Sequence, residues 1–485
     1  MNKILLDITI NSSNSLKECL KKIEKNTYGV CFVLKNKKVI NVISDGDIRR
    51  ALLKNFKLSS KVYKIKKNKF YYVYFNYNLI QLYKKIDKYK VVPILTKNKK
   101  LIDFATKYRV RQIPQAEPNL TGNELKYVSE AINSGWISSR GKFVNEFEKK
   151  FKEKFKFKYC LTVSNGTAAL HLALASLGLK ENDEVIVPNY TFVSPINTII
   201  YTKAKPVLVD VNYNDMCINI DSVLKNINSK TKAIIAVHLY GHVAQIEELR
   251  RICSKKNIFL IEDCAESIGA YVNKRSVGSF GDISTFSFFA NKTMTTGEGG
   301  MVVFNNKKTF ELARNLRDHG MLIKRYWHNQ VGFNYRLTNI QSAIGVAQLE
   351  KLDLFLEKKK NIFLLYSKYF SVNQKIDFPY NIEKSKNSYW LFYIKLKNLG
   401  IEDKNYEKYR DKMVDFLNFN GIEARHGFYA ASLMKIYEKY KLKTEQYKNS
   451  LLLSQRIITL PSSINLKSEE IKYISSKVLE FLENS

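Results

Sequence analysis

The chain has 485 residues, of which 45% are hydrophobic and 13% aromatic, a composition that predicts two or three well-packed globular domains. Its apolar runs are shorter than the ~18 to 20 residues of a transmembrane helix, and its first segment, MNKILLDITINSSNS, lacks the pattern of a secretory signal. We therefore expect a cytoplasmic protein with no membrane partner. Because its lysines occur along the whole chain among Asn, Ile and Tyr, the formal charge of +35 predicts an anionic substrate rather than a nucleic-acid partner.

Residues 1–112 contain two similar segments, each predicted as a helix, a strand, a short basic turn and a second strand. The first begins near Ser15 and continues through GVCFVLKNKKVINVISDGDIRRALL; the second begins near Asn78 and continues through KVVPILTKNKKLIDFATKYRV. A duplication of this size indicates two like units that pack together. The motif SDGDIRR, from Ser44 to Arg50, resembles a CBS domain, and the resemblance implies an α+β CBS pair over residues 1–112.

In CBS domains, a Ser or Thr and an Asp three residues later hold the ribose of a nucleotide. The resemblance therefore implies Ser44 and Asp47 as the contacts of a regulatory nucleotide. The second copy has Thr106 but Arg109 in place of the Asp, so one such site is expected at most. A module that only assembles the protein is the equal alternative.

The segment RQIPQAEPNL (111–120), with two of the eight prolines, predicts a linker. After it, amphipathic helices (NELKYVSEAINSG, GTAALHLALASLG, QIEELRRICSKKN) alternate with short apolar strands (DEVIVP, KPVLVDV, TKAIIAVHL, IFLIEDC, ISTFSF, GGMVVF). Strands this apolar are buried on both faces, which predicts a mostly parallel sheet flanked by helices. Beyond about residue 360, scattered strands (SYWLFYIKL, IITLP) predict a smaller C-terminal α/β subdomain. The expected domains are 1–112, 113–360 and 361–485.

Lys292 lies in STFSFFANKTMTTGEGGMVVF, in a turn between a predicted strand and a glycine-rich stretch. A lysine in a turn is ordinarily a surface residue. This segment, however, resembles the cofactor-lysine motif of the DegT/DnrJ/EryC1/StrS sugar aminotransferases, a fold-type I family, and the resemblance extends over about residues 113–485. It implies pyridoxal 5′-phosphate (PLP) as the cofactor and Lys292 as the catalytic lysine that forms a Schiff base with it.

Further segments fall in register with the same family. Asp263 ends the predicted strand IFLIED, where ligands of open α/β sheets bind, and EDCAESIGA resembles the family's aspartate motif. The resemblance implies Asp263 at the pyridine nitrogen and Glu266 near the cofactor. The sequence SNGT before a helix is either a helix cap or an anion site, and the resemblance implies phosphate contacts from Gly166, Thr167 and the hydroxyl of Ser287.

Phe192, in NYTFVSPINT, is implied to stack on the cofactor ring, although by itself it predicts a core residue. Asn334, in VGFNYRLTN, is implied to reach the phosphate held by the neighbouring subunit, which predicts a homodimer with shared active sites; a plain loop would not require a dimer. The cysteines form no Cys-x-x-Cys pair and no cluster with histidine, so no metal site is expected. Cys264 is interpreted as a small buried residue.

Two segments concern the substrate. GWISSRGKFVNEFE implies that Trp136, Ile137 and Ser138 face it. LRDHGMLIKRYWHNQVGFNYRLTN most resembles perosamine synthases, which aminate C4 of GDP-4-keto-6-deoxymannose, and His328 and Arg336 are the candidate contacts to its sugar or diphosphate. The resemblance implies ping-pong transfer of the amino group from glutamate, in the biosynthesis of a surface polysaccharide such as an O-antigen.

The segment Arg425–Tyr429 (RHGFY) departs from the Arg-Pro-Phe-Phe-Tyr-like sequence that many relatives carry near the substrate. A UDP-linked 4-keto sugar or a 3-keto sugar is therefore the alternative substrate. A PLP-fold regulator or sensor without catalysis is the alternative that is not an enzyme. The presence of both Lys292 and Asp263 argues against it, because a protein without catalysis would be free to lose either residue.

Overall fold

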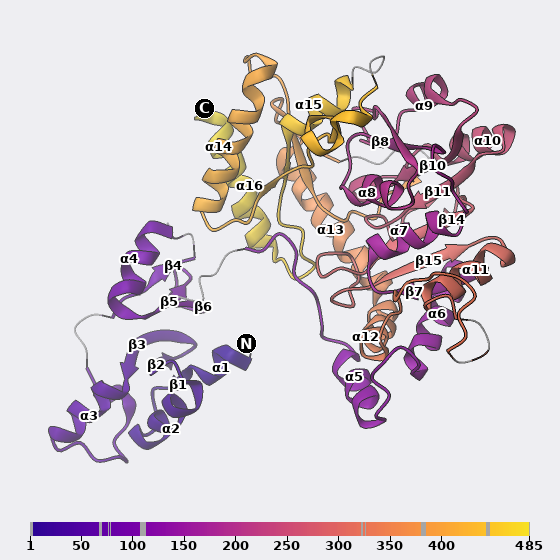
Figure 1. The fold of residues 1–485 in the computed structure, drawn as a ribbon. Coiled ribbons are helices and arrows are strands. Elements are labelled where there is room, and N and C mark those ends of the chain that lie inside the picture. The colour runs from indigo at the N-terminus through magenta and orange to yellow at the C-terminus, as the bar shows by residue number, and fades with distance from the viewer. Residues whose placement is uncertain are drawn as a thin grey trace. The chain divides into compact units, whose positions relative to one another are not determined.

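The computed structural model describes residues 3–66, 70–75, 77, 79–106, 113–321, 324, 326–379, 385–442 and 447–484. The chain forms two compact units: residues 1–113 with 415–423, and residues 114–414 with 424–485. Figure 1 shows α1 to β6 in the first unit, and the large sheet with its helices in the second. Within the described ranges, no helix is long and apolar enough to cross a membrane.

The N-terminal unit repeats one topology twice. In each copy a short strand lies parallel to the first strand of an antiparallel hairpin, and the hairpin register shifts at the same point, Val33/Leu34 and Ile94/Leu95. The structure thus confirms the internal duplication. The elements are α1 (Lys3–Asp7), β1 (Thr9–Asn11), α2 (Leu16–Asn26), β2 (Val30–Lys35), β3 (Lys38–Ser44) and α3 (Asp45–Leu53), then β4 (Val73–Tyr74), α4 (Leu79–Tyr89), β5 (Val91–Leu95) and β6 (Leu101–Thr106).

Local sequence explains these elements. Ser15 caps α2, and its hydroxyl accepts from the N–H of Glu18 while the Glu18 carboxylate accepts from the N–H of Ser15. Apolar side chains from both copies, among them Phe32, Val39 and Phe104, form one shared cluster. Each three-stranded sheet is too small to bury its apolar face alone, so this shared cluster stabilises the pair.

The second unit is built on a seven-stranded sheet with the order β7-β15-β14-β11-β10-β8-β9. The five strands from β14 to β9 are parallel to their neighbours, and β15 is antiparallel to both β14 and β7. The predicted mostly parallel sheet is confirmed, and each strand predicted for it is present. The strands are β7 (Tyr159–Val163), β8 (Glu184–Pro188), β9 (Lys205–Val209), β10 (Thr231–Val237), β11 (Phe259–Asp263), β14 (Ile283–Ser287) and β15 (Gly300–Phe304).

Helices flank this sheet, and β8, β10 and β15 are buried over almost all of their residues. Helix α7 is buried from Ala168 to Leu174, in accordance with its apolar sequence. The helices of this part are α5 (Glu124–Asn133), α6 (Lys142–Phe155), α7 (Gly166–Ala175), α8 (Ser194–Tyr201), α9 (Ile220–Asn226), α10 (Ile246–Lys256), α11 (Lys307–Arg317), α12 (Asn339–Glu350) and α13 (Leu352–Phe370).

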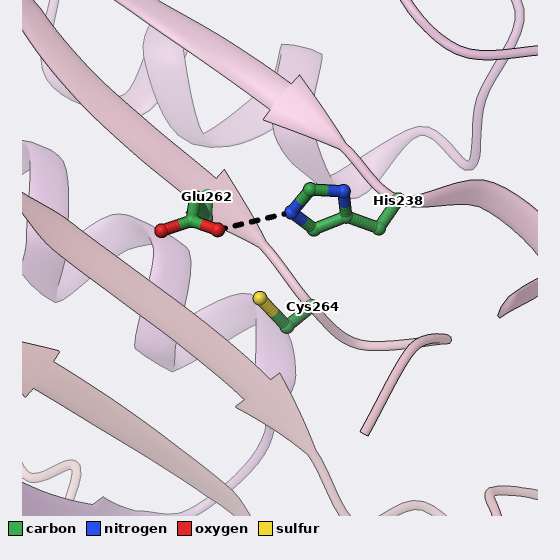
Figure 2. Close-up of side chains that lie close together, drawn as sticks. All are labelled: His238, Glu262 and Cys264. Carbon is green, nitrogen blue, oxygen red and sulfur yellow. Dashed lines mark hydrogen bonds and ion pairs between the residues drawn. The ribbon is translucent and has the colours of Figure 1, made fainter. Parts of the chain in front are cut away.

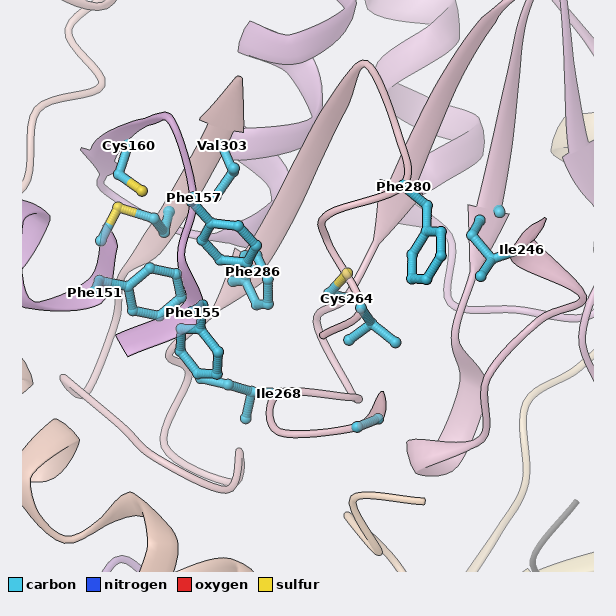
Figure 3. Packing of buried hydrophobic residues seen from close by; sticks show 14 of the residues in the cluster. Phe151, Phe155, Phe157, Cys160, Ile246, Cys264, Ile268, Phe280, Phe286 and Val303 are labelled. Carbon is cyan, nitrogen blue, oxygen red and sulfur yellow. The ribbon is translucent and has the colours of Figure 1, made fainter. Parts of the chain in front are cut away.

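An aromatic cluster anchors α6 to the sheet (Figure 3). Phe151 and Phe155 on α6 pack against Phe286 on β14, with ring centroids 5.2 and 6.4 Å apart, and Phe157 joins them. Because β14 ends at Ser287, this packing holds the strand end from which the turn of Lys292 departs.

The C-terminal part forms an antiparallel sheet in the order β16-β18-β20-β19. The predicted strands SYWLFYIKL and IITLP correspond to β18 and β20. Its elements are β16 (Ile376–Asp377), β18 (Tyr393–Leu396), α14 (Tyr406–Phe419), β19 (Arg425–His426), α15 (Lys448–Arg456), β20 (Ile457–Thr459) and α16 (Ser468–Glu483), and a small separate sheet contains β12 (Tyr271–Val272), β13 (Arg275–Ser276) and β17 (Ser385–Lys386).

Candidate active site

A cavity of about 690 Å³ opens at the carboxyl ends of the parallel strands, where open α/β sheets bind their ligands. β11 contributes Asp263 and β14 contributes Ser287, the last residue of each strand. The structure brings seven of the predicted residues together in its lining: Gly166, Thr167, Phe192, Asp263, Glu266, Ser287 and Lys292.

Lys292 lies in the turn after β14, with its side chain 13% exposed. Its Nζ is 3.6 Å from Oε1 of Glu266 and 3.9 Å from the ring centroid of Trp390. Burial lowers the pKa of Lys292, and the negative charges of Glu266 and Asp263 offset part of this shift. A lowered pKa increases the fraction of neutral amine, the form that attacks a carbonyl group.

Asp263 and Glu266 are the two buried carboxyl groups of the cavity. Oδ1 of Asp263 accepts a hydrogen bond from the N–H of Ala265 at 3.0 Å, and burial raises the pKa of Asp263 although Lys292 opposes the shift. Oε2 of Glu266 accepts from the N–H of Tyr240 at 2.9 Å, and burial raises the pKa of Glu266 to about 7. Both groups can therefore exchange a proton with a base placed against them.

The N-terminus of α7 forms the anion-binding end of the cavity. Asn165 caps the helix by accepting from the N–H of Ala168 at 2.8 Å. Within the described chain the N–H groups of Gly166 and Thr167 have no hydrogen-bond partner, so they can meet an anion at the positive end of the helix. A Cβ on Gly166 would lie 2.9 Å from Cβ of Ser287, so glycine is what allows the Ser287 hydroxyl to lie this close to the helix start.

Four aromatic rings form one wall of the cavity and the layer behind it. Phe192 contacts Phe428 with centroids 6.1 Å apart, Phe428 stacks on Tyr240 at 5.4 Å, and Tyr240 stacks on Trp390 at 6.1 Å. Nε1 of Trp390 donates to the carbonyl of Asn291 at 2.9 Å, which fixes the indole above the amine of the following lysine. The sequence did not predict Trp390 or Tyr240 as site residues, because their partners are distant in the chain: Trp390 and Asn291 are 99 positions apart.

Further cavity residues that the sequence did not predict are His171 and Tyr335, whose Nδ1 and hydroxyl are 2.9 Å apart, and the exposed Glu298. Arg425 and Phe428 also line the cavity. They belong to the segment that departs from the family sequence, and that departure is the signal that could have pointed to them.

The structure does not bring the predicted substrate residues to this cavity within one chain. Trp136 and Ile137 are 59% and 50% exposed, and Ser138 is exposed as well. Nε of Arg336 donates to the Ser139 hydroxyl at 3.0 Å, and its guanidinium is paired with Asp318. The remaining two predicted residues of this region are also exposed: His328, whose Nδ1 is 3.0 Å from the carbonyl of His319, and Asn334.

His238, Glu262 and Cys264 form a buried group close enough to hold a metal ion (Figure 2). Their atoms are already engaged. Nδ1 of His238 accepts from the N–H of Ala244, so its other nitrogen is left to donate to Glu262 at 3.1 Å. Glu262 also accepts from three backbone N–H groups, and burial raises the pKa of the Cys264 thiol well above its ordinary value. Through these hydrogen bonds, the cluster connects the carboxyl ends of β10 and β11 to the loop that follows β13 and contains Gly278.

In the N-terminal unit, Ser44 and Asp47 form the capping box of α3. The hydroxyl and the N–H of Ser44 both donate to Oδ2 of Asp47, at 2.7 and 2.8 Å, and Oδ1 accepts from Arg50 at 2.7 Å. A ribose bound here would compete with these bonds. Thr106 ends β6, whereas Arg109 lies outside the described residues.

The cavity fits PLP by the chemistry of its donors. It offers a largely buried amine with a lowered pKa, a buried carboxyl whose Oδ2 accepts no hydrogen bond from the described residues, and unpartnered N–H groups at a helix start beside a serine hydroxyl. These match an aldehyde, a pyridine nitrogen and a phosphate. The aromatic wall supplies apolar cover for a ring.

Comparison with known proteins agrees with this fit. Residues 118–479 match the DegT/DnrJ/EryC1/StrS aminotransferase family, and residues 2–54 match the CBS domain. The chain is 44% identical to the GDP-perosamine synthase of Vibrio cholerae, covering 76% of this chain and 99% of that protein, and 37% identical to that of Caulobacter vibrioides, covering 74% and 95%.

Among solved structures, it resembles the Helicobacter pylori aminotransferase PseC of pseudaminic acid biosynthesis, with a TM-score of 0.72 and 28% identity over 77% of this chain and all of that chain. The PLP form of a putative sugar aminotransferase from Streptococcus pneumoniae gives a TM-score of 0.72 and 26% identity, covering 77% and 99%. With its fold, its cavity and these relatives in agreement, the chain belongs to the PLP-dependent DegT/DnrJ/EryC1/StrS aminotransferase family and carries a CBS domain at its N-terminus.

Proposed function

We propose that this aminotransferase moves the amino group of glutamate to C4 of GDP-4-keto-6-deoxymannose, as a GDP-perosamine synthase of surface-polysaccharide biosynthesis. The observation that carries the proposal is Lys292, largely buried beside the carboxyl group of Glu266, in a cavity that Asp263 also lines and whose anion-binding end lies at the start of α7. The sugar is inferred from the 44% identity to a GDP-perosamine synthase along almost all of that protein.

Bound PLP would supply an electrophilic carbon and an electron sink for amino transfer. In our proposal Gly166, Thr167 and Ser287 hold its phosphate, Asp263 keeps its ring nitrogen protonated, and Phe192 covers the ring. Lys292 Nζ would take the proton from the amino-bearing carbon of glutamate in the first half-reaction and would deliver a proton to C4 of the sugar in the second, since its lowered pKa allows it to act as a base and then as an acid. Glu266, with a pKa of about 7, can hold the proton that Lys292 releases 3.6 Å away.

The first test is a panel of keto-sugars. The protein with PLP and glutamate should aminate GDP-4-keto-6-deoxymannose, detected by mass spectrometry, and should leave UDP-linked 4-keto sugars and 3-keto sugars unchanged. Lys292→Ala should abolish the visible absorbance of bound PLP and turnover. Lys395→Ala, at a buried lysine that is not among the residues lining the cavity, should keep both. Amination of a UDP sugar alone would move the proposal to that substrate, and a protein that gives no spectral change with glutamate would be a regulator.

We further infer a homodimer with shared sites, in which Asn334 of one subunit reaches the phosphate bound by the other. The exposure of Asn334, together with the exposed apolar Trp136, Ile137 and Val331, supports this inference. A mixture of the Lys292→Ala and Asn334→Ala variants, each inactive alone, should regain up to about a quarter of wild-type activity, because half of the dimers are mixed and each contains one intact site. No recovery after subunit exchange would contradict the shared site.

The CBS match supports a regulatory nucleotide at Ser44 and Asp47. Because both side chains already bond each other, we expect weak binding that Asp47→Asn weakens further. Calorimetric titration with GDP, GMP and AMP tests this, and indifference to all three would leave assembly as the role of the unit. We place the reaction in the cytoplasm, which the six free, buried cysteines support.

A further inference from the structure

The positive charge of the chain is concentrated in its N-terminal unit. Residues 1–113 contain 27 basic and 7 acidic residues, a formal charge of +20 out of the total of +35. The lysines occur along the whole chain, as the sequence interpretation had it, but their excess over acidic residues is largest in this segment. These 113 residues make up less than a quarter of the chain and carry more than half of its net charge, so a partner that neutralises them must be strongly anionic.

Within this unit, the same tetrapeptide, KNKK, occurs at the turn of both hairpins, Lys35–Lys38 and Lys97–Lys100. The structure joins these two turns, which we call the lysine tips. Lys38 and Lys100 form an antiparallel bridge, and the N–H of Val39 donates to the carbonyl of Lys99 at 2.9 Å. Six lysines from two sequence-distant turns therefore lie at one edge of the unit.

The six lysines of the tips are all exposed, and in the described part of the chain none of them forms an ion pair. Two carboxylates near the tips are engaged by other groups. Glu18, which lines a groove together with Lys37, accepts from the N–H and the hydroxyl of Ser15, and Oδ1 of Asp103, three residues after Lys100, accepts from the N–H of Phe104. A groove of about 530 Å³ adjoins one tip, and Lys37 lines it together with Lys21. The positive charge of the tips is thus available to a partner rather than neutralised within the fold.

The shape and residue type of the tips decide between anionic partners. Hairpin turns are convex and present point charges, since all six residues are lysine and none is arginine, whose planar group recognises individual phosphates. Ile40, 41% exposed, alternates with Lys38 on the outward face of β3 and adds an apolar contact. Convex lysine clusters of this size match the surface of a bilayer with acidic headgroups.

We propose that the lysine tips are a docking surface for an anionic lipid bilayer, which holds the protein at a membrane without crossing it. This departs from the expectation of no membrane partner. It rests on the N-terminal unit alone and is independent of the proposed function. Each lysine that reaches the headgroups should contribute about fivefold in affinity, so if half of them do so, neutralising the tips should weaken binding about hundredfold.

The test uses the full chain with vesicles of phosphatidylcholine alone or with phosphatidylglycerol, in a flotation assay. A tip variant changes to Gln the six lysines at positions 35, 37, 38, 97, 99 and 100. A control variant makes the same change in charge at six other exposed lysines of the unit: Lys17, Lys54, Lys57, Lys61, Lys64 and Lys66. Circular dichroism establishes that both variants are folded.

The expected result is binding of the wild type to vesicles that contain phosphatidylglycerol only, a loss of this binding in high salt, and a loss of about hundredfold in the tip variant against less than tenfold in the control. Equal losses in the two variants would overturn the proposal, since net charge and not the tips would then explain binding. So would tip-dependent binding of a single-stranded oligonucleotide without any binding to vesicles.

Discussion

Substitution of Glu266 by Gln should change how the stability of the catalytic unit depends on pH. Burial raises the pKa of Glu266 from its ordinary value of 4.5 to about 7 in the folded protein. Between these two values the folded state therefore binds more protons than the unfolded state, so this carboxyl lowers the free energy of unfolding as the pH rises from 4.5 to 7. The difference corresponds to about 3 kcal/mol above pH 7, and it already includes the stabilisation of the carboxylate by the nearby Lys292 ammonium.

Gln keeps an oxygen for the N–H of Tyr240 but cannot ionise. The Glu266→Gln variant should be as stable as the wild type at pH 4 and about 3 kcal/mol more stable at pH 8. Urea unfolding of the cofactor-free protein, followed by tryptophan fluorescence, measures this, because all three tryptophans lie in the second unit. Glu298→Gln, at an exposed glutamate of the same cavity, is the control for the replacement of a carboxylate by an amide. If Glu266→Gln retained the slope of the wild type, the titration would have to be assigned to another group.

Two further substitutions test the cofactor cradle. Gly166→Ala adds a Cβ that would lie 2.9 Å from Cβ of Ser287, so it should weaken PLP binding about tenfold. The binding of pyridoxal, which lacks the phosphate, should not change. Equal losses of affinity for the two ligands in absorbance titrations would contradict a phosphate-binding role of Gly166. Lys359→Met removes a buried amine that donates to the carbonyl of Trp390 at 2.8 Å, so it should loosen the indole over the active-site lysine and weaken PLP binding about tenfold. Lys395→Met, at an equally buried lysine that donates to the carbonyl of Tyr213 instead, is the control and should keep the wild-type affinity. The same affinity for PLP in both variants would make Lys359 a purely structural residue.

The sequence predicted those parts of the site that short segments carry. Lys292, Asp263 and Ser287 each follow or end an apolar strand, and the parallel arrangement of such strands brings their carboxyl ends to one edge of the sheet. Gly166 and Thr167 can also be located from the local sequence, because the start of a helix is recognisable from its capping residue, here Asn165. Position within an element made these residues candidates, and the family resemblance assigned their roles.

Contacts between distant segments were not predictable in this way. Trp390 approaches Lys292 only because the C-terminal part packs against the turn after β14, and no periodicity in SYWLFYIKL separates a cavity residue from a core residue. The same holds for His238 and Glu262, which resemble metal ligands in isolation but use their hydrogen-bonding atoms within the core. The paired lysine tips were visible as a repeat, but only the bridge between Lys38 and Lys100 gathers their charge.

The RHGFY segment now has a physical explanation that bears on the sugar. A Cβ at Gly427 would lie 2.6 Å from the hydroxyl oxygen of Tyr190 and 2.7 Å from Cβ of Ile457, so close packing behind the cavity wall requires glycine at this position. Arg425 and Phe428, on either side, still line the cavity. The segment departs from the family sequence at His426, which is exposed and is not among the residues lining the cavity, and at Gly427, which packs behind the wall. The guanidinium-bearing and aromatic positions therefore stay at the cavity, where a sugar diphosphate can meet them. On this argument RHGFY does not by itself favour a UDP-linked or 3-keto sugar over the GDP-linked 4-keto sugar.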